Sequence, residues 1–139
     1  MMTGAMMMKM TSGRTNKMEP NYDFIRLFES QKLNQVCLLN SGKYRSFTDR
    51  KDIEPVDDPK LCSYHVQQLM SEIGEVLEAD KRWKNFRDDK YDKDEKAEEI
   101  ADCFIVLMNI AMFSGMSASE LYDTISAKIG TVSERIKKC

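Results

Sequence analysis

Hydrophobic positions recur at helical rather than strand spacing through four segments of the chain. The first segment covers residues 20–40 and carries apolar side chains from Phe24 to Leu39, with Gly42 as a plausible stop. The second runs from about residues 59–64 to Trp83, and its apolar positions form a narrow stripe that we expect to face a core. These positions are Val66, Leu69, Met70, Ile73, Val76 and Leu77.

The third segment, from about Asp94 to Ser114, is apolar all round between Cys103 and Phe113, apart from Asn109. This pattern predicts a central helix that is buried on several sides. Gly115 is a typical helix end, and Ser117 to Glu120 forms a capping box that opens a fourth helix. The stripe of that helix consists of Leu121, Ile125, Ile129, Val132 and Ile136. The prediction is an all-α fold with four main helices.

The rest of the chain consists of polar connections and a distinctive N-terminal stretch. Residues 41–60 and 84–94 are polar and charged, and no segment alternates as a strand does. The first eighteen residues hold seven of the eleven methionines without periodicity or a signal-peptide core. We therefore expect residues 1–18 to be a disordered tail and residues 19–139 to form a single all-α domain. Met18 is a hypothetical natural start.

Composition narrows the classes of function. A net charge of −2 gives no reason to expect binding to a nucleic acid polymer or an acidic membrane, and no apolar run is long enough to span a bilayer. Four scattered cysteines and one histidine argue against a zinc site and against a disulfide framework. A reducing, cytoplasmic compartment is the expectation that follows.

Two acidic pairs carry the most specific chemical signal. Glu72 and Glu75 lie three residues apart on the second helix, and Glu99 and Asp102 repeat that spacing on the third. Residues at this spacing share one side of a helix, so two packed helices would gather four carboxylates. Such a cluster is tolerable mainly when hard cations neutralise it, and Mg²⁺ is the usual cation beside phosphate substrates. The alternative is that both pairs are ordinary exposed charges.

Glu75 complicates this interpretation. On an ideal helical wheel it points away from the apolar stripe, while Glu72 flanks that stripe. If the stripe faces the core, Glu75 can join a buried site only when something else covers its side of the helix. Asn109 lies two turns beyond Asp102, and its amide needs a partner, either a neighbouring backbone carbonyl or a substrate.

Residues 65–135 resemble the MazG-like all-α nucleoside triphosphate pyrophosphohydrolases, which include dimeric dUTPases and phage dCTP/dUTP pyrophosphatases. The resemblance lies in Glu72/Glu75 followed by Glu99/Asp102, in the apolar run after them, and in the segment 115–121. Lys128 and Arg135 resemble the basic residues that end the last helix of the family. Val132 stands where the family often has Asn, and Ile105 where one branch often has His.

The resemblance implies a MazG-like bundle completed by oligomerisation and an activity to match. Glu72, Glu75, Glu99 and Asp102 would hold Mg²⁺, for which Mn²⁺ is a possible substitute. Water activated there would attack the α-phosphate of a (d)NTP and release pyrophosphate, with Glu72 or Glu75 taking its proton. The implied partners are a nucleoside triphosphate and a second copy of the chain, as a homodimer or homotetramer.

Several further side chains are candidates for contact with the substrate. Basic residues near the site would neutralise phosphate charge, although each also fits a solvated surface role. Trp83 would stack on a base or sugar, or would only cover the end of the second helix. His65 and Gln68 share the side of Glu72 and Glu75. The substrate-binding candidates are Gln68, His65, Trp83, Lys84, Asn109, Lys128 and Arg135, with Lys81, Arg82 and Arg87 as further basic candidates.

Two alternatives remain open at this point. Within the same superfamily, hydrolysis of phosphoribosyl-ATP is compatible with the same motifs. In a different class, the chain is a non-catalytic helical interaction module whose apolar surfaces serve a partner protein. A di-iron carboxylate bundle is excluded, because it needs ExxH motifs on two helices and the chain has none.

Overall fold

The computed structural model describes residues 22–51, 53, 57–84 and 90–138, and this part of the chain is all-helical. Its elements are α2 (Tyr22–Asn40), α3 (Pro59–Ala79), the short 3-10 helix η2 (Lys81–Trp83), α4 (Lys93–Phe113) and α5 (Ala118–Lys137). The four α-helices confirm the predicted all-α class. The tail expected at 1–18 lies outside the described residues. No helix among them combines the length and apolar character needed to cross a membrane.

Local sequence signals account for the helix ends. Asp58 caps α3 by accepting a hydrogen bond from the Leu61 N–H, with Pro59 in the first turn. Ser117 and Glu120 form the predicted capping box of α5. Gly42 and Gly115 follow α2 and α4 with φ values of 81° and 83°, which a side chain would strain.

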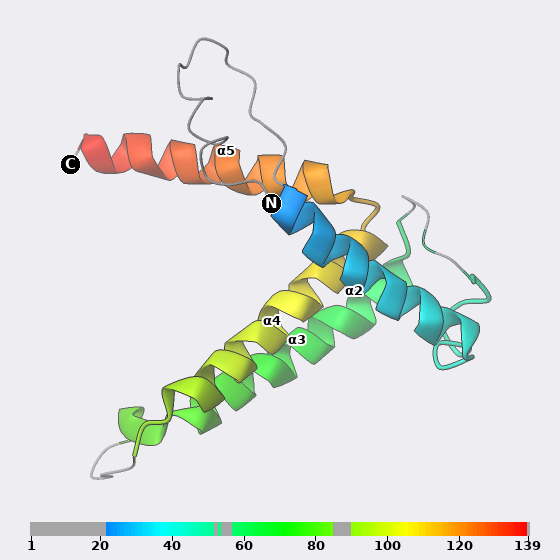
Figure 1. The fold of residues 1–139 in the computed structure, drawn as a ribbon, viewed down its shortest axis with the longest axis horizontal. Helices are drawn as coiled ribbons and strands as arrows, with labels where there is room; N and C mark the ends of the chain where they lie inside the picture. Colours follow the sequence, from blue (N-terminus) through cyan, green and yellow to red (C-terminus); the bar gives the residue numbers. More distant parts are fainter. Residues whose placement is uncertain (1–21, 52, 54–56, 85–89, 139) are drawn as a thin grey trace.

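Helices α3 and α4 run antiparallel, side by side, and form a hairpin (Figure 1). Helix α2 crosses this hairpin near the start of α3 and the end of α4, and α5 leaves the crossing in a different direction from the hairpin (Figure 1). The core lies at the crossing. Its largest fully buried apolar side chains are Phe28, Leu61, Met112 and Phe113.

The expectation that the apolar stripe of α3 faces the core is wrong for four of its six residues in the single chain, whereas Leu69 and Val76 are half-buried. Val66, Met70, Ile73 and Leu77 are 43 to 68% exposed. Helix α3 is instead rotated so that another row of buried and half-buried side chains meets α4, and we call the two facing rows the seam. On α3 the seam comprises Leu61, His65, Leu69, Glu72 and Val76; on α4 it comprises Glu99, Cys103, Val106, Ile110 and Phe113.

The expectation that residues 103–113 are buried on several sides also needs correction. The end of this run is buried, with Asn109 at 4% exposure and Phe113 at 0%, because α2 crosses there. Earlier in the run, Phe104 is 63% and Leu107 is 44% exposed. Among the described helices, α3 is the one that packs along that part of α4, so the other described elements leave one side of α4 uncovered.

The stripe of α5 is uncovered in the same way. Leu121 packs against the core, and the Tyr122 ring lies 5.7 Å from the Phe24 ring of α2. Beyond these first turns Ile125, Ile129, Val132 and Ile136 are exposed.

Candidate metal centre

Three of the four paired carboxylates meet between α3 and α4. Glu72 and Glu99 belong to the seam and are half-buried, whereas Glu75 is exposed one turn further along α3. Each of these three residues offers a carboxylate oxygen, and the three oxygens all lie within 4.8 Å of one another. The structure therefore gathers three of the four predicted carboxylates within a single chain. Glu75 joins Glu72 and Glu99 within one chain and needs no second subunit, because the side of α3 that turns away from α4 is the exposed part of the apolar stripe.

Helical geometry places Asp102 beside this cluster. Glu75 directly precedes the seam residue Val76, and Asp102 directly precedes the seam residue Cys103. Each step along a helix rotates the side chain by 100° about the helix axis. In an antiparallel pair, the residues that directly precede seam residues therefore lie on the same side of the pair in both helices. Gln68 and Asn109 hold the equivalent positions. We call Gln68, Glu75, Asp102 and Asn109 the polar face of the hairpin.

The electrostatics of the cluster reflect its crowding. Burial raises the pKa of Glu72, and the negative charges of Glu75 and Asp102 raise it further. Burial and the charges of Glu75 and Asp102 likewise raise the pKa of Glu99. Asp102 is thus close enough to act on both seam carboxylates. The carboxylate cluster is therefore more stable when it takes up a proton or binds a cation than when all of its carboxylates are ionised and no cation is bound.

The Glu99 side chain gives independent evidence that the cluster needs a binding partner that the described residues do not supply. Its Oε2 atom is buried and has no hydrogen-bond partner in the described part of the chain. A buried carboxylate oxygen without a partner is costly and calls for a cation or solvent ligand. The three clustered donors are all carboxylate oxygens, and such a donor set suits a hard divalent ion such as Mg²⁺ or Mn²⁺.

Asn109 finds a partner that sequence reasoning did not identify. Its Oδ1 accepts a hydrogen bond of 2.9 Å from Nε2 of Gln31 on α2. The partner is a side chain, not the backbone carbonyl considered from the sequence. Gln31 is half-buried. Its position on the inner side of an amphipathic helix was the sequence signal that could have indicated a buried polar contact. The contact ties α2 to the polar face.

His65 lies in the core of the molecule. It is 1% exposed, and its ring stacks on Phe113 with the ring centroids 5.3 Å apart. Its Nε2 lies 3.4 Å from the Tyr44 hydroxyl, which donates to Gln35 Oε1 at 2.6 Å. Burial lowers the pKa of His65 to about 4, so the ring is neutral near pH 7. A direct contact between His65 and a substrate would require this core to open.

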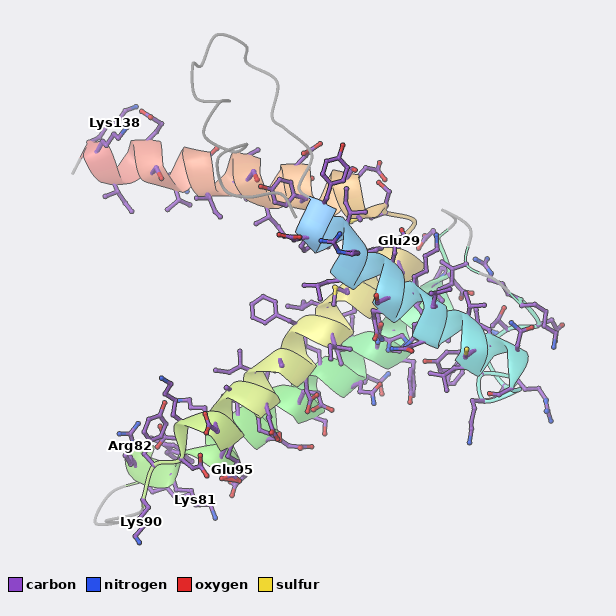
Figure 2. All side chains as sticks on the ribbon, viewed as in Figure 1. Glu29, Lys81, Arg82, Lys90, Glu95 and Lys138 are labelled. Carbon is purple, nitrogen blue, oxygen red and sulfur yellow. The ribbon has the colours of Figure 1, made fainter. Side chains whose placement is uncertain are left out.

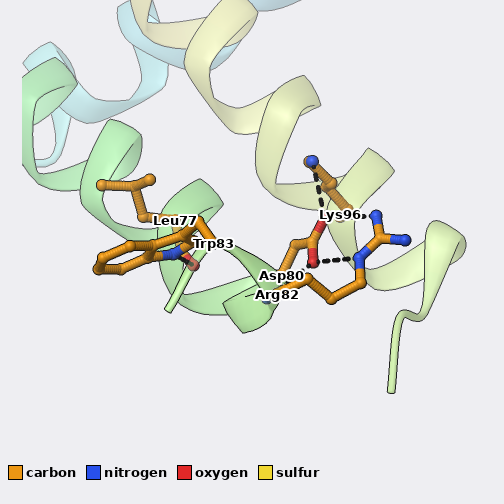
Figure 3. A network of polar contacts seen from close by, with 5 residues as sticks. All are labelled: Leu77, Asp80, Arg82, Trp83 and Lys96. Carbon is orange, nitrogen blue, oxygen red and sulfur yellow. Dashed lines mark hydrogen bonds and ion pairs between the residues drawn. The ribbon is translucent and has the colours of Figure 1, made fainter. Parts of the chain in front are cut away.

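The hairpin tip is a second polar site, which sequence reasoning missed. Asp80 accepts two hydrogen bonds of 2.7 Å from Arg82 and one of 3.1 Å from Lys96 of α4 (Figure 3). These bonds, with those to Arg82 foremost, hold the pKa of Asp80 well below its ordinary value. The Asp80 carboxylate therefore joins the end of α3 to the first turns of α4 and helps to set their register.

Trp83 and Lys84 also lie at this tip, beyond the end of α3. The Trp83 indole N–H donates to the Leu77 carbonyl at 3.1 Å, so the side chain covers the helix end (Figure 3). The Lys84 ammonium lies 5.4 Å from the Trp83 ring centroid. Lys81, Arg82 and Lys90 gather at the same end of the hairpin (Figure 2). The basic candidate Arg87 lies outside the described residues.

The last two basic candidates are remote from the carboxylates within one chain. Lys128 and Arg135 are exposed on α5, seven residues apart and thus on one side of that helix. Helix α5 packs mainly on α2 and diverges from the hairpin (Figure 1). A single chain therefore does not bring these two residues to the acidic cluster.

A surface cavity of about 300 Å³ is found elsewhere in the molecule. Residues 39–42, 45 and 48–51 line it, so it belongs to the end of α2 and the connection that follows. None of the clustered carboxylates borders it.

Comparison of the chain with protein-family models, with curated proteins and with solved structures finds no match.

Proposed function

We propose that this protein is a Mg²⁺-dependent nucleoside triphosphate pyrophosphohydrolase that converts a (d)NTP and water into a (d)NMP and pyrophosphate. The observation that carries the proposal is the carboxylate cluster of Glu72, Glu75 and Glu99, with Asp102 beside it. The buried, unpartnered Oε2 of Glu99 supports a bound cation at this cluster. The resemblance to the MazG-like enzymes supports the choice of reaction.

The charge of the cluster argues for a cation-dependent reaction. A triphosphate cannot approach four carboxylates without a divalent ion between them, because like charges at this range repel strongly. When bound, Mg²⁺ would supply Lewis-acid polarisation of the phosphate and an activated water. The four carboxylates would hold the ion, two from each helix.

The chain's own groups have definite tasks in this proposal. Glu72 and Glu75 are the proposed acceptors of the proton that the attacking water loses. The raised pKa of Glu72 suits that task, because a general base works best when its pKa approaches the operating pH. On the polar face, the amides of Gln68 and Asn109 are proposed to orient the substrate, with Gln31 holding Asn109 in place.

Two further pairs of residues are proposed to contact the substrate, and the resemblance supports the second pair. Trp83 and Lys84 at the hairpin tip are proposed to contact the nucleotide from the far end of α3. Lys128 and Arg135 on α5 are proposed to neutralise phosphate charge from another copy of the chain in a homodimer or homotetramer.

One observation favours a second candidate function. The exposed apolar residues of α3, α4 and α5 are those that a helical interaction module would use to bind a partner protein. In that case the carboxylates would be solvated charges with no catalytic role. The two functions differ in whether the protein turns over a nucleotide.

A substrate panel tests the proposal. The purified protein is incubated with each common NTP and dNTP, and with dUTP, in the presence of Mg²⁺, and pyrophosphate and monophosphate are measured. We expect equal amounts of both products from at least one substrate, and loss of turnover with a chelator. Release of orthophosphate instead, or no turnover of any nucleotide, would contradict the proposal.

A further inference from the structure

The surface cavity at the end of α2 plays no part in the proposed hydrolysis. Its volume of about 300 Å³ lies at the lower end of the roughly 300–1,000 Å³ that is typical of small-molecule sites. It belongs to the end of α2 that is remote from α5 (Figure 1). We call it the α2-end cavity, and we call residues 41–51, which follow α2, the 41–51 loop.

The lining of the α2-end cavity is cationic. Arg45, Arg50 and Lys51 border it together with a single acid, Asp49, in a chain whose net charge is −2. The large apolar residue of the lining, Leu39, is only 3% exposed. A cation would be repelled here, and an apolar ligand would find little surface to contact. The cavity therefore favours an anion.

The protein itself compensates these positive charges only weakly. Among the described residues, no ion pair involves Arg45 or Lys51. Arg50 has one long contact, of 3.9 Å from its Nε to Oδ2 of Asp58. Its Nη1 atom is buried and has no hydrogen-bond partner within the described part of the chain. The Arg50 guanidinium thus keeps donor capacity for a ligand.

The end of α2 opposes an anion less than a helix end usually does. The last carbonyl oxygens of a helix carry partial negative charge and repel anions when they are free. Here the carbonyl oxygens of residues 36–39 accept hydrogen bonds of 2.8 to 3.4 Å from groups of residues 40–43. These carbonyls are therefore already satisfied within the protein.

The 41–51 loop is held in shape without a ligand. The side-chain amide of Asn40 donates to the Lys51 carbonyl at 2.9 Å and so joins the two ends of the loop. Tyr44, in the middle of the loop, is 7% exposed, and its hydroxyl donates to Gln35 of α2 at 2.6 Å. A loop fixed in this way needs little ordering when a ligand binds, which favours affinity.

Two further residues of the lining suit an oxyanion. Gly42 has a φ of 81°, and the Arg45 guanidinium occupies the space that a Cβ at this position would take. The guanidinium therefore lies directly against the loop backbone. The Thr48 hydroxyl accepts a hydrogen bond of 3.1 Å from the Arg50 N–H, which leaves its own proton to donate to a ligand.

We propose that the α2-end cavity binds a phosphate group, either as inorganic phosphate or as part of a small phosphate ester. The guanidinium groups of Arg45 and Arg50 offer paired N–H donors that match two phosphate oxygens, and Lys51 adds charge. Thr48 adds a neutral donor. Such a site needs no divalent ion, in contrast to the carboxylate cluster. It also stands independently of the proposed hydrolysis.

Titration of the metal-free protein with phosphate tests this site. Protein stripped of divalent ions is titrated with inorganic phosphate and, separately, with a nucleoside monophosphate at constant ionic strength, while its backbone amide resonances are followed. We expect saturable shifts in residues 40–51 and unchanged resonances in residues 72–75 and 99–102. The ligand that binds more tightly identifies the source of the phosphate group.

Charge-matched variants complete the test. Arg45→Gln with Lys51→Gln removes two exposed charges of the lining, whereas Arg26→Gln with Lys43→Gln removes two charges outside it. We expect the Kd to rise at least about tenfold in the first variant and to change little in the second, with helical circular dichroism retained in both. Lys51→Gln alone replaces the first variant if that variant does not fold, with the same direction of change.

Three results would overturn the proposal. The first is a wild-type protein that binds neither ligand saturably. The second is a set of shifts centred on residues 72–75 and 99–102, and the third is equal weakening in both charge-matched variants. Because no divalent ion and no triphosphate is present, failure of the hydrolysis assay leaves the result of this titration unchanged.

Discussion

The two faces of the α3–α4 hairpin differ in almost every physical property, although their residues lie close together in the sequence. The apolar face comprises the exposed residues Val66, Met70, Ile73 and Leu77 of α3 and Ile100, Phe104 and Leu107 of α4. Ile73 on this face directly follows the seam residue Glu72, and Glu75 on the polar face directly precedes the seam residue Val76. One face carries the carboxylates of Glu75 and Asp102, beside the seam residues Glu72 and Glu99 whose pKa values are raised, and the other exposes uncharged aliphatic and aromatic side chains. One pair of helices thus presents carboxylates on one side and exposed apolar side chains on the other.

The largest expected effect is loss of turnover when the polar side is altered. Glu75→Gln removes one charge and one oxygen donor from the cluster, and we expect activity to fall by at least roughly 100-fold with the helical fold retained. Steady-state pyrophosphate release measures this. Glu78→Gln is the matched control, since Glu78 lies on the same helix and pairs only at the surface with Lys81. Wild-type turnover in Glu75→Gln would remove that residue from the site.

The second prediction concerns pH and the seam between the faces. Burial lowers the pKa of His65 from 6.5 to about 4, so between these pH values the unfolded chain binds a proton at His65 that the folded chain does not bind. This contribution to stability is intact above pH 6.5 and is lost as the pH falls toward 4, with a total of about 3 kcal/mol. Denaturant unfolding across this pH range measures it.

His65→Gln provides the control for that measurement, because it removes the titrating ring from the same buried position. We expect the difference in unfolding free energy between wild type and variant to shrink as the pH falls from 6.5 to 4. A difference that stays constant over this range would show that His65 titrates normally in the folded protein.

Much of this fold was predictable from local signals, and the reason is physical. Pro59, Gly115 and the Ser117–Glu120 capping box act on their own helix ends, so they can be interpreted without knowledge of tertiary structure. The spacing of the acidic pairs acts in the same local way. The structure brings Glu72, Glu75 and Glu99 together as that spacing indicated.

The orientation of α3 was not predictable from hydrophobicity. A stripe such as Met70, Ile73 and Leu77 fits either the core of one chain or the surface of an assembly, and a helical wheel does not distinguish them. The seam actually contains His65 and Glu72, which a hydrophobic ranking places outside. The bond from Gln31 to Asn109 depends on how α2 crosses the hairpin, which no local pattern encodes.

The third prediction tests the register that aligns both faces. Asp80→Asn weakens the bonds to Arg82 and Lys96 that join the end of α3 to α4. We expect the melting temperature to fall by roughly 5 °C. Glu134→Gln, which breaks an exposed pair with Lys137, should change it little. Equal small shifts in both variants would show that the tip does not fix the register.

The smallest expected effect comes from charge repulsion within the cluster. Burial and neighbouring charges raise the pKa values of Glu72 and Glu99, so ionisation destabilises the folded chain as the pH rises above the ordinary carboxylate range. With a chelator present at pH 8, we expect Glu75→Gln to melt a few degrees higher than wild type, roughly 2–4 °C. At pH 4 the difference should vanish. A lower melting temperature for the variant at pH 8 would refute net repulsion at this site.

Calorimetric titration of the chain with Mg²⁺ and with Mn²⁺, without any nucleotide, shows directly whether the carboxylate cluster binds a divalent ion. We expect saturable binding by the wild type and by Glu78→Gln, and its loss in Glu99→Gln, because the buried Oε2 atom of Glu99 has no hydrogen-bond partner among the described residues. Equal binding by wild type and Glu99→Gln, or no binding by the wild type, would contradict the claim that these carboxylates share a divalent ion.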